Sequence, residues 1–149
     1  MVWITDASED AIAVARANLA GIGRPARNVR VGEGSWFDPL PADARFDVIV
    51  SNPPYVAMGS PDLADSVADW EPVAALLSGD DGLDDIRLLV AGAPGHLEPD
   101  GWLVLEIGAD QGDRVGGLLV AAGYRAVEIR PDLAGRDRIA LGQRPIGDA

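Results

Sequence analysis

The residues with the clearest chemical potential form the run Asn52-Pro53-Pro54-Tyr55, which directly follows an apolar segment. The side-chain oxygen of Asn52 and the carbonyl oxygen of Pro53 are neighbouring acceptors, so together they can accept both N–H bonds of one planar NH₂ group. The two prolines fix φ and stiffen the chain, and Tyr55 supplies a flat apolar wall. The run therefore predicts a binding site for an amino or amide group. A rigid loop start after a strand is the structural alternative.

The segments around this run predict a parallel α/β sheet, because short apolar runs alternate with helical patterns. We expect strands over residues 2–5, 28–31, 46–50 and 102–107, and helices that begin after Ser8 and span residues 83–97 and 111–122. We expect a turn at residues 99–101, and a long loop over residues 56–80 with a helical turn near residues 62–67. In such sheets ligands bind at the carboxyl ends of the strands, which is where Asn52 lies.

The last two predicted strands, residues 124–130 and 138–142, are joined by a link without a helix. We therefore expect this final pair to be antiparallel.

Composition excludes several classes of protein. The 149 residues are 48% hydrophobic and include no cysteine, which excludes a disordered chain, a disulfide scaffold and a zinc-thiolate site. No apolar run reaches the roughly 18 residues that span a bilayer, and no export signal opens the chain, so we expect a cytoplasmic protein without membrane contact. The net charge of −12 disfavours direct binding to nucleic acid.

The Asn-Pro-Pro-Tyr run resembles the motif of S-adenosylmethionine-dependent amino-methyltransferases. Several further motifs, in the same order along nearly the whole chain, resemble the HemK/PrmC family of protein-(glutamine-N5) methyltransferases, which act on peptide-chain release factors. These further motifs are Gly34-Ser35-Trp36-Phe37, Glu71-Pro72 with Ala75-Leu76, Gly79-Asp80-Asp81-Gly82-Leu83-Asp84, Leu105-Glu106-Ile107-Gly108 with Gln111-Gly112, and Gly135-Arg136-Asp137-Arg138.

The resemblance implies a Rossmann-like class I methyltransferase fold, with a mostly parallel sheet and an antiparallel last strand. It implies methylation of a glutamine side-chain amide of a release factor, with S-adenosylmethionine as cofactor and no metal. Asn52 and Pro53 would be catalytic, and with Pro54 and Tyr55 they would bind the substrate. Asn52 would also contact the cofactor.

Two residues outside the run are further candidates for cofactor binding. Asp6 follows the first predicted strand, and an acid at this place can bind ribose hydroxyls. The resemblance places Trp36 beside the adenosyl group, although Gly34-Ser35-Trp36 departs from the family's usual Gly-Asp-Trp. The structural alternatives are a favourable charge at a helix N-terminus for Asp6 and a core position for Trp36.

The family's first strand, with its glycine-rich turn, and its N-terminal helical domain have no counterpart in the chain. We therefore expect residues 1–149 to form one incomplete catalytic domain whose first strand is missing. Residues 2–5 and 46–50 would then be exposed strand edges that favour self-association. Glu106-Ile107-Gly108 with Gln111-Gly112 could be a glycine-rich nucleotide loop, but its spacing is not G-x-G-x-x-G, so we do not expect it to bind the cofactor. We interpret the run from Gly135 to Arg138 as an ion-paired turn with a structural role. The rival functions are a DNA adenine or rRNA guanine methyltransferase and a non-catalytic remnant.

Overall fold

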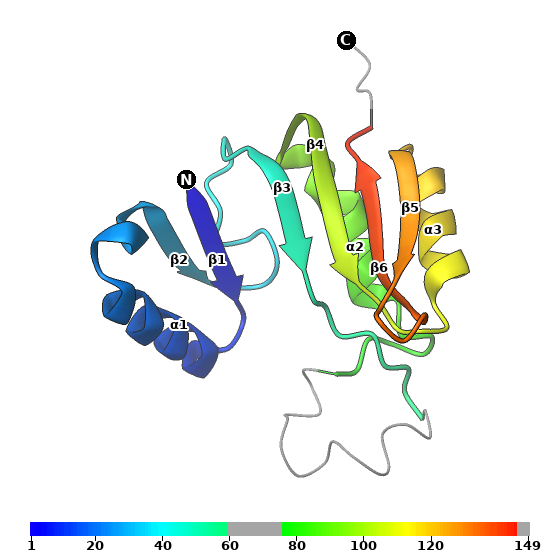
Figure 1. Cartoon of the computed structure of the whole chain (residues 1–149), viewed down its shortest axis with the longest axis horizontal. Helices are drawn as coiled ribbons and strands as arrows, with labels where there is room; N and C mark the ends of the chain where they lie inside the picture. The colour runs from blue at the N-terminus through cyan, green and yellow to red at the C-terminus, as the bar shows by residue number, and fades with distance from the viewer. Residues whose placement is uncertain (60–75, 146–149) are drawn as a thin grey trace. The chain divides into compact units, whose positions relative to one another are not determined.

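The computed structural model describes residues 1–59 and 76–145. It divides the chain into two compact units, Met1–Ala44 and Arg45–Ala149, each with its own sheet (Figure 1). The helical turn predicted near residues 62–67 lies outside the described residues. Among the described residues, no helix is long and apolar enough to cross a membrane.

The first unit is a β–α–β arrangement. Strand β1 (Val2–Asp6) pairs in parallel with β2 (Val29–Glu33), and helix α1 (Glu9–Ile22) and the 3₁₀ helix η1 (Arg24–Asn28) connect them. As predicted, Ser8 caps α1, because its hydroxyl accepts the backbone N–H of Ala11 at 3.3 Å. Gly23 ends the helix at φ 73°, a conformation that glycine adopts readily.

The second unit holds a four-stranded sheet in the order β3-β4-β6-β5. Its elements are β3 (Phe46–Ser51), α2 (Asp84–Gly92), η4 (Ala93–Gly95), β4 (Leu97–Glu106), α3 (Gly112–Ala121), β5 (Arg125–Pro131) and β6 (Asp137–Gln143). Strands β3 and β4 are parallel, whereas β6 is antiparallel to both β4 and β5. The predicted antiparallel closing pair is therefore confirmed.

The core of the second unit lies on one face of this sheet. Along β4, Leu103 and Leu105 are fully buried, whereas the alternate residues Trp102 and Val104 are only half-buried. Helices α2 and α3 both lie on one side of the sheet (Figure 1), and their apolar residues complete the core. The site described below stands at the carboxyl ends of β3 and β4, which are fixed by this packing.

The helix predicted over residues 83–97 is too long at its C-terminal end. Helix α2 ends at Gly92, because Pro94 has no N–H to donate to the carbonyl of Val90. The buried hydroxyl of Tyr124 donates to that carbonyl instead, at 2.9 Å. Leu97 then begins β4 as a fully buried residue.

The turn predicted at residues 99–101 lies within the bounds of β4 rather than between two elements, at a stretch without partners on β3. The pairing of β3 with β4 shifts register between Phe46 and Val48, which face Leu97 and Trp102 respectively. Asp100 adopts a positive φ of 64° within this irregular stretch. A proline followed by a residue with positive φ is typical of a tight turn, so the predicted turn is retained as an interruption of the pairing with β3.

Candidate functional site

Asn52 stands at the carboxyl end of β3, as the sequence predicted. The ladder to β4 ends at the pair Ser51 and Leu105, and it cannot continue through Pro53 and Pro54, which have no N–H. Asn52 is exposed, and its side chain makes no hydrogen bond to any described residue. Its amide is thus available to an incoming group.

The two residues that follow Asn52 are less accessible. Pro53 is less than 2% exposed and Pro54 is half-buried. Asn52 is therefore open to solvent, whereas Pro53 is part of the packed interior.

Both the backbone carbonyl and the side-chain hydroxyl of Tyr55 are in polar contacts. Its backbone carbonyl accepts a hydrogen bond from Nε2 of Gln111 at 2.9 Å, and its hydroxyl lies 3.4 Å from Nη1 of Arg138. Arg138 also donates to the carbonyl of Ile107 at 3.2 Å and lies 3.8 Å from the carboxylate of Glu106. Half-buried Tyr55 is therefore fixed through both its backbone and its hydroxyl, and its role as a flat surface for a substrate stays a prediction.

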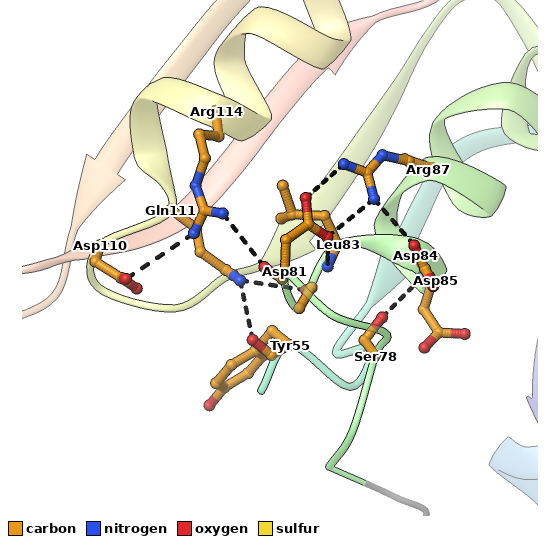
Figure 2. A network of polar contacts seen from close by, with 11 residues as sticks. Tyr55, Ser78, Asp81, Leu83, Asp84, Asp85, Arg87, Asp110, Gln111 and Arg114 are labelled. Carbon is orange, nitrogen blue, oxygen red and sulfur yellow. Dashed lines mark hydrogen bonds and ion pairs between the residues drawn. The ribbon is translucent and has the colours of Figure 1, made fainter. Parts of the chain in front are cut away.

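A second segment pairs with the chain after Tyr55. Val56 donates to the carbonyl of Leu76 at 2.9 Å and accepts the N–H of Ser78 at 3.0 Å, while Met58 donates to Gly79 at 2.9 Å. The buried hydroxyl of Ser78 accepts the N–H of Asp85 at 2.8 Å, which ties the segment to the start of α2 (Figure 2). These contacts hold residues 56–58 against residues 76–79 and the start of α2.

The acidic run before α2 is occupied by structural contacts. The carboxylate of Asp81 binds Arg87 through two hydrogen bonds, at 2.6 and 3.0 Å, and also accepts the N–H of Leu83 at 3.2 Å (Figure 2). The hydrogen bond from Arg87 holds the pKa of Asp81 below its usual range, and Asp81 in turn raises the pKa of Arg87. Asp81 therefore stays ionised and is unsuited to act as a proton donor near neutral pH.

Asp6 and Trp36 lie in the first unit, at the carboxyl ends of β1 and β2. The backbone carbonyl of Asp6 accepts the N–H of Gly34 at 3.0 Å, and the hydroxyl of Thr5 lies 3.5 Å from the carbonyl of Trp36. One carboxylate oxygen of exposed Asp6 accepts the N–H of Ser8 at 2.8 Å, which leaves the other oxygen for a ligand. The structure thus brings these two predicted residues together.

Trp36 has an unusual backbone. Its φ is 44°, a left-handed conformation that costs roughly 1–2 kcal/mol for a residue with a side chain, and its side chain is half-buried. Such strain persists only where the surroundings impose it, and it often marks a functional position. Half-burial of the side chain is compatible with both the core position and the adenosyl contact weighed for Trp36.

Two residues of the site were not predicted as such. Gln111 and Arg138 both contact Tyr55, although the sequence interpretation assigned neither residue a binding role. The sequence contained a signal for both residues, because each belongs to one of the ordered motifs that accompany the Asn52 run. Among the described residues, no group of three or more His, Asp or Glu side chains could hold a metal ion, and the chain has no cysteine.

Comparison with known proteins supports the same interpretation. No family model matches the chain. A protein of Xylella fastidiosa named release factor glutamine methyltransferase is 48% identical over 144 residues, which is 97% of this chain and 51% of that protein. Proteins of the same name from Neisseria gonorrhoeae and Pseudomonas aeruginosa are each 45% identical over 95% of the chain. The chain spans about half the length of the curated relatives it matches.

Solved structures show the fold. A methyltransferase from Pyrococcus furiosus matches 97% of this chain and 63% of its own, with a TM-score of 0.66 and 21% identity. A release-factor-specific protein-(glutamine-N5) methyltransferase from Alicyclobacillus acidocaldarius matches 97% of this chain and 80% of its own, with a TM-score of 0.52 and 26% identity. The predicted class I methyltransferase fold is confirmed, and the chain is a homologue of the release factor glutamine methyltransferases, as its HemK/PrmC-like motifs indicated.

Proposed function

We propose that this chain carries the amide-binding site of an S-adenosylmethionine-dependent methyltransferase that methylates a glutamine side chain of a peptide-chain release factor. The observation that carries the proposal is the exposed amide of Asn52 at the carboxyl end of β3, which makes no hydrogen bond to the residues that the structure describes and lies three residues before the anchored Tyr55. The relatives named release factor glutamine methyltransferase support the choice of substrate.

The residues of the first unit fit the proposed cofactor. Asp6 has a free carboxylate oxygen at an exposed position, which suits a ribose hydroxyl, and half-buried Trp36 offers an aromatic ring close in sequence to that edge. When bound, S-adenosylmethionine would supply an electrophilic methyl group. We propose that both units belong to one catalytic domain, since single solved methyltransferase chains match 97% of this chain.

The proposed catalysis depends mainly on positioning, because an amide nitrogen is a poor nucleophile. The oxygen of Asn52 accepts one N–H of the substrate amide, and the carbonyl of Pro53 accepts the other once its surroundings open. Both oxygens stabilise the positive charge that develops on the nitrogen as it accepts the methyl group. The methylated nitrogen is then acidic enough to lose its proton to water, so this chemistry requires neither a strong base nor a metal.

The main alternative is methylation of an exocyclic amino group in DNA or rRNA, since an Asn-Pro-Pro-Tyr run suits any planar NH₂ group. The net charge of −12 disfavours it, because a phosphate backbone would be repelled. A non-catalytic remnant is the second alternative. A release factor takes part in protein synthesis, so we propose a cytoplasmic location.

A chimera provides the test, because the chain matches only half of its relatives. This chain would replace the matching 144 residues of the Xylella fastidiosa relative, and the unchanged relative would serve as the positive control. We expect labelled methyl transfer from S-adenosylmethionine to a release factor, with the label on a glutamine by mass spectrometry. Label in DNA or rRNA instead would favour the first alternative. A chimera that transfers no label, and does not bind S-adenosylhomocysteine by calorimetry, would favour the remnant.

A further inference from the structure

We propose that Gln111 is a positioning residue that sets the direction of the Asn52–Tyr55 loop. It lies at the start of α3, more than fifty residues from the loop in sequence, and its side chain reaches the backbone of Tyr55 (Figure 2). The structural part of this inference stands by itself, and its consequence for methyl transfer rests on the proposed function.

The side chain of Gln111 uses its whole amide in contacts with backbone. Its Oε1 accepts the N–H of Gly108 at 2.9 Å, while Nε2 donates to the carbonyl of Tyr55 at 2.9 Å and to that of Gly82 at 3.2 Å. Gln111 is only 2% exposed, so water does not compete for these bonds. A primary amide has two N–H donors and one carbonyl acceptor. A side chain that ends in an amide and has the length of glutamine can therefore satisfy the N–H of Gly108 and both carbonyls.

Two glycines next to the Gln111 amide leave room for its hydrogen bonds because they have no Cβ. A Cβ at Gly82, whose φ is 74°, would lie 2.5 Å from the carbonyl oxygen of Tyr55 and 3.0 Å from Nε2 of Gln111. A Cβ at Gly108 would lie 3.0 Å from Oε1 of Gln111. Three backbone segments thus approach one buried amide closely, which indicates that their relative placement is determined at this point.

The proline pair couples the position of the Tyr55 backbone to the position of Asn52. Pro53 and Pro54 have no N–H, so this stretch cannot be anchored through backbone donors. Their fixed φ angles also leave little freedom between Tyr55 and Asn52. The hydrogen bond from Gln111 to the carbonyl of Tyr55 therefore fixes the near end of a stiff segment whose far end is the exposed amide.

Hydrogen exchange on the 149-residue chain tests the structural part. Gln111→Glu keeps an acceptor for Gly108 but loses the donors to Tyr55 and Gly82. We expect the amides of Val56 and Met58 to exchange at least about tenfold faster, with no change along β4. Gln143→Glu is the matched control, because Gln143 makes only one exposed side-chain bond, to the carbonyl of Asp100 at 3.1 Å.

A second variant guards against a general loss of stability. Gly82→Ala keeps the amide of Gln111 but places a Cβ 2.5 Å from the carbonyl oxygen of Tyr55 and 3.0 Å from Nε2 of Gln111, so it should raise exchange at the same two amides. Faster exchange along β4 as well, in both variants, would show that Gln111 only supports the fold. Unchanged exchange at Val56 and Met58 in both variants would also overturn the proposal.

Kinetics of the chimera test the consequence for methyl transfer. Gln111→Glu should lower kcat at least about tenfold, while the affinity for S-adenosylhomocysteine changes less than about twofold, since Asn52 is misdirected in the transition state. Equal losses of kcat and cofactor affinity would refute a positioning role. If the unsubstituted chimera transfers no methyl group, the proposed function fails, and hydrogen exchange still decides whether Gln111 places the loop.

Discussion

Replacement of Asn52 by alanine should separate catalysis from stability. Asn52 is exposed, and its side chain has no hydrogen-bond partner among the described residues, so the substitution removes no hydrogen bond among those residues. It precedes Pro53 at the end of β3, where the extended backbone suits alanine as well as asparagine. We therefore expect Asn52→Ala to change the free energy of unfolding by less than about 0.5 kcal/mol.

The expected kinetic effect is much larger. The substrate amide loses one of its two proposed acceptors, and that acceptor acts most strongly when positive charge develops on the nitrogen. By analogy with a lost oxyanion-hole donor, the cost is about 2.7–4 kcal/mol, or a roughly 10²–10³-fold lower kcat. Affinity for the cofactor should fall far less, because Asp6 and Trp36 carry most of that proposed binding.

Labelled methyl transfer to a release factor by the chimera, together with urea unfolding of the 149-residue chain, measures both effects. Asn18→Ala is a matched control, since Asn18 is an exposed residue of α1 outside the site. Near-normal turnover by Asn52→Ala would remove Asn52 from the mechanism. A loss of stability comparable to the kinetic loss would show instead that Asn52 supports the loop.

Four further predictions follow from the described contacts. Asp6→Ala should raise KM for S-adenosylmethionine about tenfold with kcat nearly unchanged in steady-state kinetics, because the ribose lies away from the reacting methyl group. Tyr124→Phe leaves the carbonyl of Val90 without its donor, and urea titration should show a loss of about 1–3 kcal/mol in unfolding free energy. Burial raises the pKa of Tyr124, so thermal stability should fall as pH rises above about 10, when only the unfolded chain ionises, and Tyr124→Phe should weaken this fall. Hydrogen bonds from Arg87 and from the N–H of Arg136 lower the pKa values of Asp81 and Asp132, so these contacts should stabilise the chain above about pH 4 and lose their effect in more acidic titrations.

Local signals in the sequence predicted the elements whose ends are set by nearby residues. Ser8 caps α1 as the capping pattern indicated, and the proline pair ends β3. The end of α2 was missed because the apolar pattern continues past Pro94 to Leu97, and only the fold shows that Leu97 belongs to a strand. The local Pro99-Asp100-Gly101 pattern predicted the turn, whereas its place inside β4 follows from the pairing of β4 with β3.

The residues of the site also fall into those that local sequence predicts and those that depend on long-range contacts. The run from Asn52 to Tyr55 is contiguous, so the binding of a planar NH₂ group could be proposed from these four residues alone. Gln111 and Arg138 act through contacts with Tyr55 over 56 and 83 residues of sequence, and their own neighbourhoods resemble ordinary loops. Long-range contacts of this kind depend on which strand ends meet, which a motif does not state.

The free strand edges carry the last prediction, that the 149-residue chain associates. In the part of the chain that the structure describes, β1 pairs only with β2 and β3 only with β4, so each strand has one unpaired edge. Val2 and Val50 are 55% and 73% exposed on these strands, which adds apolar surface to open backbone groups. The net charge of −12 opposes contact between copies. At physiological ionic strength, salt screens this repulsion between charges that are more than about 8 Å apart. Association measured by size-exclusion chromatography with light scattering should therefore increase with salt, and a monomer at every salt concentration would show that these edges are protected.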